Sequence, residues 1–251
     1  MTRGSPTLID DWLRWMRDFQ REALTLMQSL EFDPDSVSDP ELLSVKFALY
    51  ARLLTSLDTA IRHTESGKLL DLRIVARNAI ECGMHMDAAS RWPDYLQKLK
   101  DDDKASRRSL AAEIPAEILD VENRRLRQEM LNDKTAKRLQ PTDLGKGSDF
   151  ARLVLVYRKI SSDTSHVTAS SLDRHMATDT EGVTRLTIDP IINDEELYEA
   201  FTVIALTLLL CTWLLIDAVP ESSRNGAMIE LAKRYQSLYR RDIRLSADQG
   251  E

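Results

Sequence analysis

The feature that most limits the possible folds is an uncharged run of 17 residues near the C-terminus, from Ala200 to Ile216. A segment of this length and composition fits the centre of a helical bundle or, at the lower limit of length, a membrane span. Three glutamates precede the run, Asp217 follows it, and no lysine or arginine flanks it to anchor a membrane helix. We therefore predict a buried central helix and expect no membrane partner.

The rest of the chain favours an all-α fold, because apolar residues recur at intervals of three and four and only 8 glycines and 8 prolines interrupt 251 residues. Residues 180–189 alternate like an extended segment, but a single strand without a partner is not a sheet, so we expect an ordered loop there. A turn is expected at 161–166, where serine, threonine and aspartate compete for backbone hydrogen bonds. The predicted helices lie at about 11–30, 41–66, 68–92, within 94–139, at 151–160, through Leu172 and His175, at 200–216 and at 224–244.

We predict that these helices form one domain over residues 1–251. The helices within 1–66 are candidates for a peripheral subdomain, and a C-terminal helix within 222–244 covers one side of the bundle. Cys82 and Cys211 lie in apolar helical stretches, which is typical of reduced, buried thiols. Charged residues interrupt the first 19 residues before an export signal can form, so the expected location is the cytoplasm.

Charge and missing motifs exclude several kinds of function. The formal net charge of −7 gives no global attraction to nucleic acid, although a local basic patch can still bind it. The phosphate-binding loop, the dinucleotide fingerprint, the zincin motif and the nucleophile elbow are all missing from the sequence. No cofactor and no metal site are implied.

One local basic patch occurs within the charged region 94–139. We interpret it as the solvated face of exposed helices in preference to an RNA-binding surface. Its members are Arg124, Arg125, Arg127, Lys134, Lys137 and Arg138.

A line of polar residues runs along the third predicted helix. Arg77 and Glu81 are one turn apart, and His85 is one turn further, so all three share a face. Spacing alone favours a helix-stabilising ion pair beside an ordinary histidine. The neighbouring positions are apolar or small, however, so the stripe is also a candidate for a buried interface, where a pair would be costly without a role.

A second group of reactive side chains lies between Tyr157 and His175. This segment holds two of the four histidines, His166 and His175, together with several hydroxyl groups. Arginine can hold a phosphate with two hydrogen bonds, and histidine can move protons near neutral pH, a combination that suits phosphodiester cleavage without a metal. The alternative is that His166 and Ser161 only cap helix ends.

These two segments resemble the bacterial domain-of-unknown-function family five-six-seven-seven, whose members pair an R-x-x-x-E helix with a later Y-x-x-L-S…H segment. The resemblance covers roughly residues 52–219. The matching residues are Arg77, Glu81, Tyr157, Ile160 in place of the leucine, Ser161 or Ser162, and His166, with Leu172, Arg174 and His175 extending the likeness.

That family is similar to HEPN helical domains, many of which are metal-independent ribonucleases of bacterial toxin and anti-phage defence systems. The resemblance implies RNA as substrate, a homodimer, and a partner protein from a defence operon. It gives Arg158 the role of holding the scissile phosphate and His166 that of assisting attack by the ribose 2′-hydroxyl. The residues shaping this site would be Arg77, Glu81, Tyr157, Ser161, Ser162, His85 and His175.

Two other functions remain open. One is a non-catalytic binding or regulatory module in which Arg77, Glu81, Tyr157 and His166 form an internal polar network. In that case these groups should be hydrogen bonded to one another, whereas an enzyme should direct Arg158 and His166 into a pocket or groove. The other is a membrane-associated effector that uses residues 200–216 as its anchor.

Overall fold

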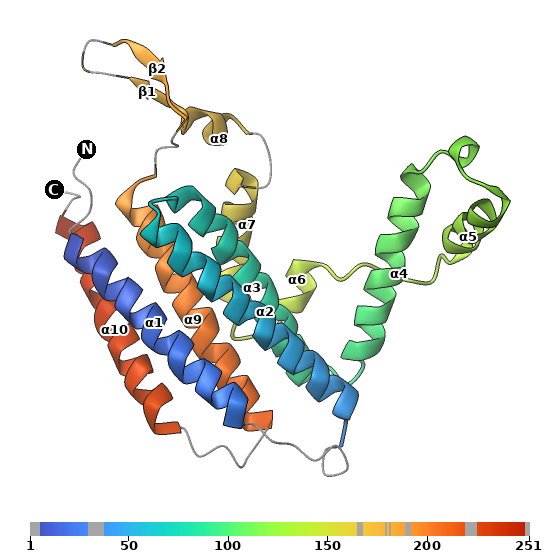
Figure 1. Cartoon of the computed structure of the whole chain (residues 1–251), viewed down its shortest axis with the longest axis horizontal. Helices are drawn as coiled ribbons and strands as arrows, with labels where there is room; N and C mark the ends of the chain where they lie inside the picture. The colour runs from blue at the N-terminus through green and yellow to red at the C-terminus, as the bar shows by residue number, and fades with distance from the viewer. Residues whose placement is uncertain are drawn as a thin grey trace.

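The computed structural model describes residues 6–29, 38–164, 168–178, 180, 182–188, 192–218 and 225–248, and these form an all-α multi-helix bundle. Two appendages leave the bundle, an arm of two helices at one side and a short helix with a hairpin at one end (Figure 1). The elements are α1 (Pro6–Ser29), α2 (Pro40–Glu65), α3 (Leu69–Arg91), α4 (Tyr95–Glu113), the 3-10 turn η2 (Ala116–Ile118), α5 (Val121–Asn132), α6 (Pro141–Leu144), α7 (Ala151–Thr164), α8 (Ala169–Asp173), β1 (Met176–Thr178), β2 (Thr184–Leu186), α9 (Asp194–Ala218) and α10 (Asn225–Asp248).

The predicted apolar helix near the C-terminus is confirmed as α9, which packs against α3, α2, α10 and α1. The Asn193 side chain starts the helix by accepting from the Glu196 backbone N–H at 2.8 Å. Within the described residues, α9 alone is long and apolar enough to cross a membrane, and 67% of its most apolar window is buried in the bundle. Core helices and membrane spans both pass this test, so the cytoplasmic location and the membrane-associated alternative both remain predictions.

Aromatic side chains join α1 to α9 and α10. Trp12 stacks on Phe201 with 5.8 Å between ring centroids, and both side chains are buried. The indole N–H of Trp15 donates to the Leu231 carbonyl at 2.9 Å, so the buried polar group of this residue has a partner. Burial of each such side chain contributes about 1.5–3 kcal/mol, which fixes α1 and α10 on the central helix.

The α3 helix lies very close to α9 because Gly83 has no side chain. A Cβ added there would lie 2.5 Å from the Phe150 ring and 2.7 Å from the methyl group of Thr207. The close approach lets α3 pack against α2, α9 and α7. It ends where Pro93 disfavours a helical conformation for the preceding Trp92, which is extended at φ −100° and ψ 118°.

Two local predictions are wrong. Residues 161–164 continue α7 and do not form the expected turn. The hydroxyl groups of Ser161 and Ser162 have partners that a helix permits, since Ser161 accepts from another helix and Ser162 donates to the Lys159 carbonyl at 2.8 Å. The rest of that predicted turn, 165–166, lies outside the described residues.

The second correction concerns 180–189, where we expected an ordered loop. Thr184–Leu186 forms β2 and pairs antiparallel with β1, so the strand has a partner just before it in the chain. The turn includes Gly182 at φ +79°, a conformation that glycine adopts without strain. Strands of three residues are too short to show alternation, which is why the sequence did not indicate β1.

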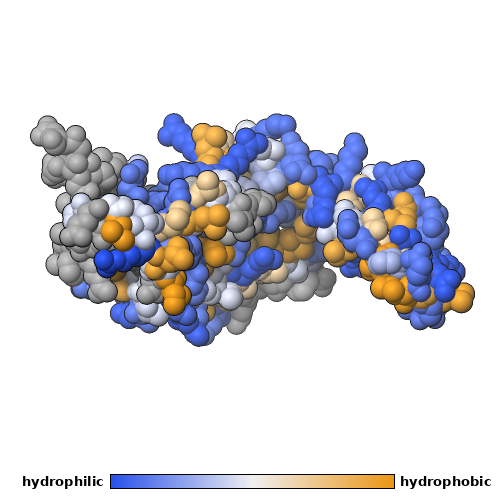
Figure 2. All heavy atoms as spheres, turned by 90° about the horizontal axis from the view of Figure 1, so that it is seen from above, coloured by the Kyte–Doolittle hydropathy of each residue, from blue (hydrophilic) through white to orange (hydrophobic). Residues whose placement is uncertain are grey.

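The arm consists of α4, η2 and α5, and it stands apart from the bundle in Figures 1 and 2. Its root is fixed by Tyr95, which is completely buried, and by the Asp102 carboxylate, which accepts from the Leu139 backbone N–H at 2.7 Å. Residues 133–140 run back along the arm to α6. The charged composition of 94–139 predicts this exposure correctly, because most of α5 is solvated.

Candidate functional site

Arg77 connects the two sequence motifs across the contact between α3 and α7. Its Nε donates to the Ser161 hydroxyl at 2.9 Å and its Nη2 donates to the Tyr157 hydroxyl at 2.9 Å. Its Nη1 lies 3.5 Å from a Glu81 carboxylate oxygen and 3.5 Å from the Asn78 side-chain oxygen. Residues about 80 positions apart in sequence therefore meet in space, and we call Arg77, Glu81, Tyr157 and Ser161 the Arg77 cluster.

The cluster lies at the edge of the core and is partly open to solvent. Tyr157 is buried, whereas the side chains of Arg77 and Glu81 are 25% and 39% exposed. The guanidinium carbon lies 4.9 Å from the Tyr157 ring centroid, a cation–π contact. Burial, together with the nearby Glu81 carboxylate, raises the pKa of Tyr157, so its hydroxyl stays protonated at neutral pH.

This geometry lets the Arg77 cluster act as a tie between two helices. All three guanidinium nitrogens of Arg77 have a partner within the chain. A phosphate arriving at this arginine would compete with Tyr157 and Ser161 for its donors, and their loss would loosen α7. The arrangement therefore favours internal bonding over capture of a ligand.

Arg158, the predicted phosphate-holding residue, does not belong to the Arg77 cluster. It lies on the exposed side of α7, and its side chain makes no hydrogen bond or ion pair with any described residue. Ser162 is also exposed, and among the described residues it bonds only within its own helix. His166 lies outside the described residues, so the geometry of the predicted Arg158–His166 pair is not described.

His85 is separate from the Arg77 cluster and lies at the root of the arm. Its Nδ1 is 2.9 Å from the hydroxyl of Tyr95, the first residue of α4. Burial lowers the pKa of His85, and the nearby carboxylates of Glu81 and Asp102 offset this only in part. A neutral imidazole at this position helps to hold α4 on α3.

His175 has a structural position beside the hairpin. Its Nδ1 lies 3.1 Å from the Thr187 carbonyl oxygen, and its backbone N–H donates to the Leu172 carbonyl. Since a carbonyl oxygen only accepts, Nδ1 carries the proton in this contact. The histidine thus joins the end of α8 to the strand that returns from the hairpin.

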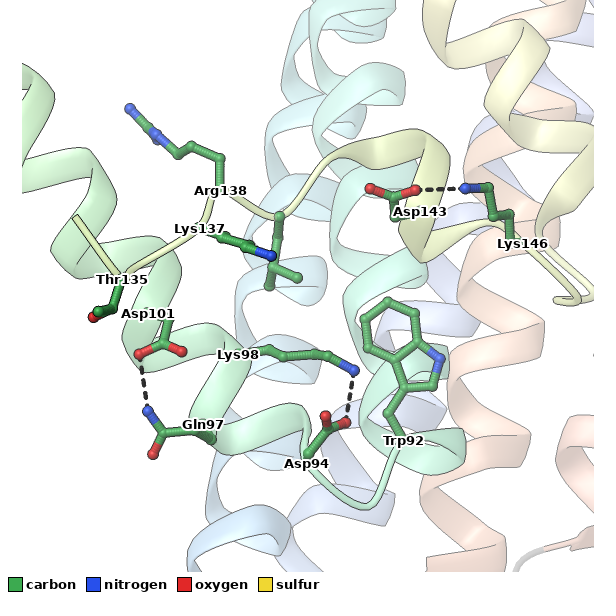
Figure 3. Close-up of a pocket in the computed structure, with 11 residues that line it drawn as sticks. Trp92, Asp94, Gln97, Lys98, Asp101, Thr135, Lys137, Arg138, Asp143 and Lys146 are labelled. Atoms are coloured by element: carbon green, nitrogen blue, oxygen red, sulfur yellow. Dashed lines mark hydrogen bonds and ion pairs between the residues drawn. The ribbon is translucent and has the colours of Figure 1, made fainter.

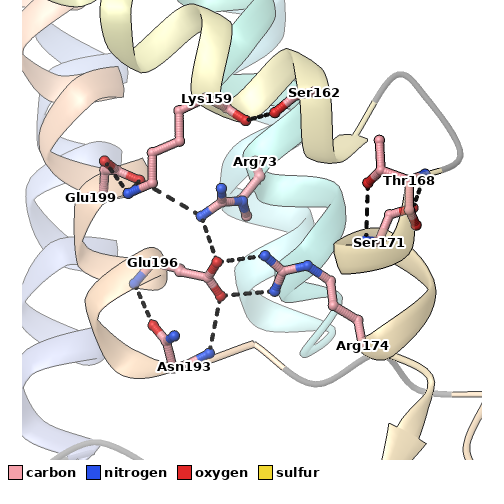
Figure 4. Close-up of polar contacts among 9 residues, drawn as sticks. All are labelled: Arg73, Lys159, Ser162, Thr168, Ser171, Arg174, Asn193, Glu196 and Glu199. Carbon is pink, nitrogen blue, oxygen red and sulfur yellow. Dashed lines mark hydrogen bonds and ion pairs between the residues drawn. The ribbon is translucent and has the colours of Figure 1, made fainter.

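A second group of charges, not predicted from the sequence, lies one turn before Arg77 on α3 (Figure 4). Arg73 is 1% exposed, and its Nη1 lies 3.4 Å from Glu196 and 3.7 Å from Glu199, both on α9. Arg174 donates to the other Glu196 oxygen at 2.8 Å, and Lys159 donates to Glu199 at 3.0 Å. We call these five residues the Arg73 cluster.

The Arg73 cluster fastens α7 and α8 to the central helices. Burial opposes the charge of Glu196, but the hydrogen bonds from Arg174 and the proximity of Arg73 outweigh it and hold the pKa of this carboxyl below its usual value. A sequence signal did exist for Glu196, because Asn193 three residues earlier forms a reciprocal helix cap with it. Nothing in the sequence indicated that Arg73 is buried.

Neither cluster resembles a metal centre. Throughout the described part of the chain, no group of three or more histidine, cysteine, aspartate or glutamate side chains is arranged to hold a metal ion. The thiols of Cys82 and Cys211 are both buried and free, and burial raises the pKa of each.

Comparisons with known proteins add no relative: no family model matches the chain, and neither a curated protein nor a solved structure matches it. The resemblance to the domain-of-unknown-function family and to HEPN domains therefore rests on the two short motifs alone, and the family relationship remains a prediction.

Proposed function

We propose that this chain is a non-catalytic helical binding module in which the Arg77 cluster ties α7 to α3. The observation that carries the proposal is the internal bonding of Arg77, whose Nε and Nη2 each donate at 2.9 Å to a hydroxyl group of α7. A catalytic arginine needs donors that are available to a phosphate. Here those donors are used inside the protein.

The appendages support a binding role because they expose apolar surface. In Figure 2, apolar side chains are exposed on the outer part of the arm among hydrophilic ones. Exposed apolar patches on proteins commonly mark interaction sites. Large apolar side chains of the arm that are more than a third exposed are Leu110, Ile114, Ile118, Val121, Leu126 and Met130.

A HEPN-like, metal-independent endoribonuclease is the second candidate. It is favoured by the partial exposure of Arg77 and Glu81 and by the position of Tyr157 and Ser161 on α7, which ends two residues before His166. In this case His166 would act with Arg158, or with Arg77 after Tyr157 gives up its hydrogen bond. A homodimer and a partner protein of a defence operon belong to this candidate.

RNA cleavage by the purified full chain separates the two candidates. Total RNA is incubated with wild type, Arg158→Ala and His166→Ala in the presence of a chelator, and melting curves are matched. The binding module predicts that RNA stays intact with all three proteins. Cleavage by wild type that disappears in His166→Ala, with an unchanged melting temperature, would establish the ribonuclease and overturn the module.

A further inference from the structure

A cleft lies between the root of the arm and the end of α3, away from the Arg77 cluster (Figure 3). Its volume is about 650 Å³, within the range of about 300–1,000 Å³ typical of small-molecule sites. Side chains from α4, from the returning segment 133–140 and from α6 line it, together with Trp92. The cleft thus has both an aromatic side chain and a set of charged ones.

The carboxylates in the cleft already have partners. Lys98 Nζ lies 2.7 Å from Asp94, and Lys146 Nζ lies 2.7 Å from Asp143. Asp101 accepts a hydrogen bond from a neighbouring glutamine side chain at 2.8 Å. Two of the three carboxylates are therefore paired with lysines of the cleft itself.

Two cations in the cleft have no such partner. Lys137 and Arg138 are exposed, and their side chains make no hydrogen bond or ion pair with any residue that the structure describes. In Figure 3, Lys137 and Lys98 extend from different segments toward the space beside Trp92, whereas Arg138 points outward at the rim. The available positive charge is thus directed into the cleft by Lys137.

The outer arginines of the same basic patch are different. Arg124 and Arg127 donate to backbone carbonyls of the arm at 2.8 and 2.9 Å, and Arg125 forms an ion pair with Glu129 at 3.4 Å. For these three residues, the interpretation as a solvated helix face agrees with the contacts. It does not describe Lys137, which lines the cleft.

An apolar wall completes the cleft. It consists of the partly buried side chains of Trp92 and Leu139. Lys98 Nζ lies 4.6 Å from the Trp92 ring centroid, a cation–π contact, so the aromatic ring and the cation are neighbours in the cleft. A ligand with an anionic group and a flat apolar part would match both features.

We propose that this cleft binds a free nucleotide, with its phosphate held by Lys137, beside the Lys98–Asp94 pair, and its base against Trp92 and Leu139. A single phosphate suits the site better than an RNA strand, because three carboxylates line the cleft and the chain carries a net charge of −7. The proposal deepens the binding-module function by naming the ligand class. The proposal rests on that function in one respect: the protein binds the nucleotide without changing it chemically.

Titration calorimetry with the full chain tests the site. The probes are adenosine monophosphate, adenosine, inorganic phosphate and a 12-nucleotide RNA. We compare wild type with Lys137→Gln and with a matched control, Lys134→Gln, which removes an exposed lysine three residues away that does not line the cleft.

We expect wild type to bind the nucleotide more tightly than adenosine or phosphate alone. Lys137→Gln should weaken nucleotide binding about tenfold, the loss of one charge-assisted hydrogen bond, and Lys134→Gln should change it less than about twofold. The site is overturned if folded wild type does not bind the nucleotide, if both variants weaken binding equally, if phosphate alone binds as tightly, or if only the RNA binds.

Chromatography of the nucleotide after the titration keeps this proposal distinct from the module function. Unchanged nucleotide supports both. Binding followed by conversion would leave the site standing and contradict the non-catalytic module.

Discussion

The Arg77 cluster and the arm cleft both contain cationic side chains in polar surroundings, but they differ in whether those side chains already have hydrogen-bond or ion-pair partners. In the Arg77 cluster, each guanidinium nitrogen of Arg77 has a partner from its own chain. In the cleft, Lys137 has none among the described residues. The ability to bind an external anion thus depends on donors that folding leaves unused, and the residue type alone does not reveal this.

Removal of Arg73 should have the largest effect on the stability of the fold. This arginine is more buried than Arg77 and so extends the comparison. Arg73→Ala leaves Glu196 and Glu199 without their buried partner and should destabilise the fold by about 3–5 kcal/mol in chemical denaturation. The control is Arg62→Ala, which removes an exposed pair with Asp58 and should cost less than about 0.5 kcal/mol. Similar losses in the two variants would mean that burial does not determine the role of these arginines.

A smaller effect is expected at Gly83, where α3 touches the central helix. Gly83→Ala places a methyl group 2.5 Å from Phe150 and 2.7 Å from Thr207, so we expect a net loss of about 1–2 kcal/mol despite the better helix propensity of alanine. Gly226→Ala is the control, because nothing lies within 4 Å of the added carbon. Equal stability of both variants and wild type in thermal melts would show that α3 can shift, and the α3–α7 contact would then be less rigid than we describe.

The smallest effect concerns the pH dependence of stability. It arises at His85, which contacts Tyr95 at the root of the arm. Because burial lowers the pKa of His85, the unfolded chain binds more protons than the folded one below the usual value of about 6.5. Stability from neutral His85 is present above that value and should decline as the pH falls toward 5.5. Urea denaturation above the usual histidine pKa of about 6.5 and again at about pH 5.5 should show this decline in wild type and not in His85→Asn.

A wild-type decline that persists unchanged in His85→Asn would assign the effect to other groups. Glu196 is not expected to contribute in this window. Its pKa is held below the usual 4.5, so its stabilising effect is lost only as the pH falls below that value.

The main features of the fold follow from patterns that a single sequence displays. The apolar run predicted α9. The helices predicted at 41–66 and 68–92 end within one residue of the expected positions, where Gly67 has φ +72° and Pro93 follows the extended Trp92. The hairpin was missed because β1 has only three residues and shows no alternation, so the extended pattern around β2 had no visible partner. Local signals report helices well, whereas the pairing of short segments depends on tertiary context.

The contacts of the Arg77 cluster were only partly predictable. The motifs suggested that Arg77, Glu81, Tyr157 and Ser161 share a site, and the structure brings these four together. The direction of each side chain was not predictable, because Arg158 is adjacent to Tyr157 and yet lies on the exposed face of α7. The role of Lys137 also depends on the path of residues 133–140, which no periodicity encodes.

A double-mutant cycle on Arg77 and Tyr157 tests the central claim most directly, namely that Arg77 is an internal tie. Chemical denaturation would compare wild type, Arg77→Ala, Tyr157→Phe and the double variant. We predict that each single variant is destabilised and that the two changes are coupled by about 0.5–1.5 kcal/mol. Additive changes within about 0.3 kcal/mol, or single variants as stable as wild type, would contradict the tie and return Arg77 to the set of groups available for a ligand.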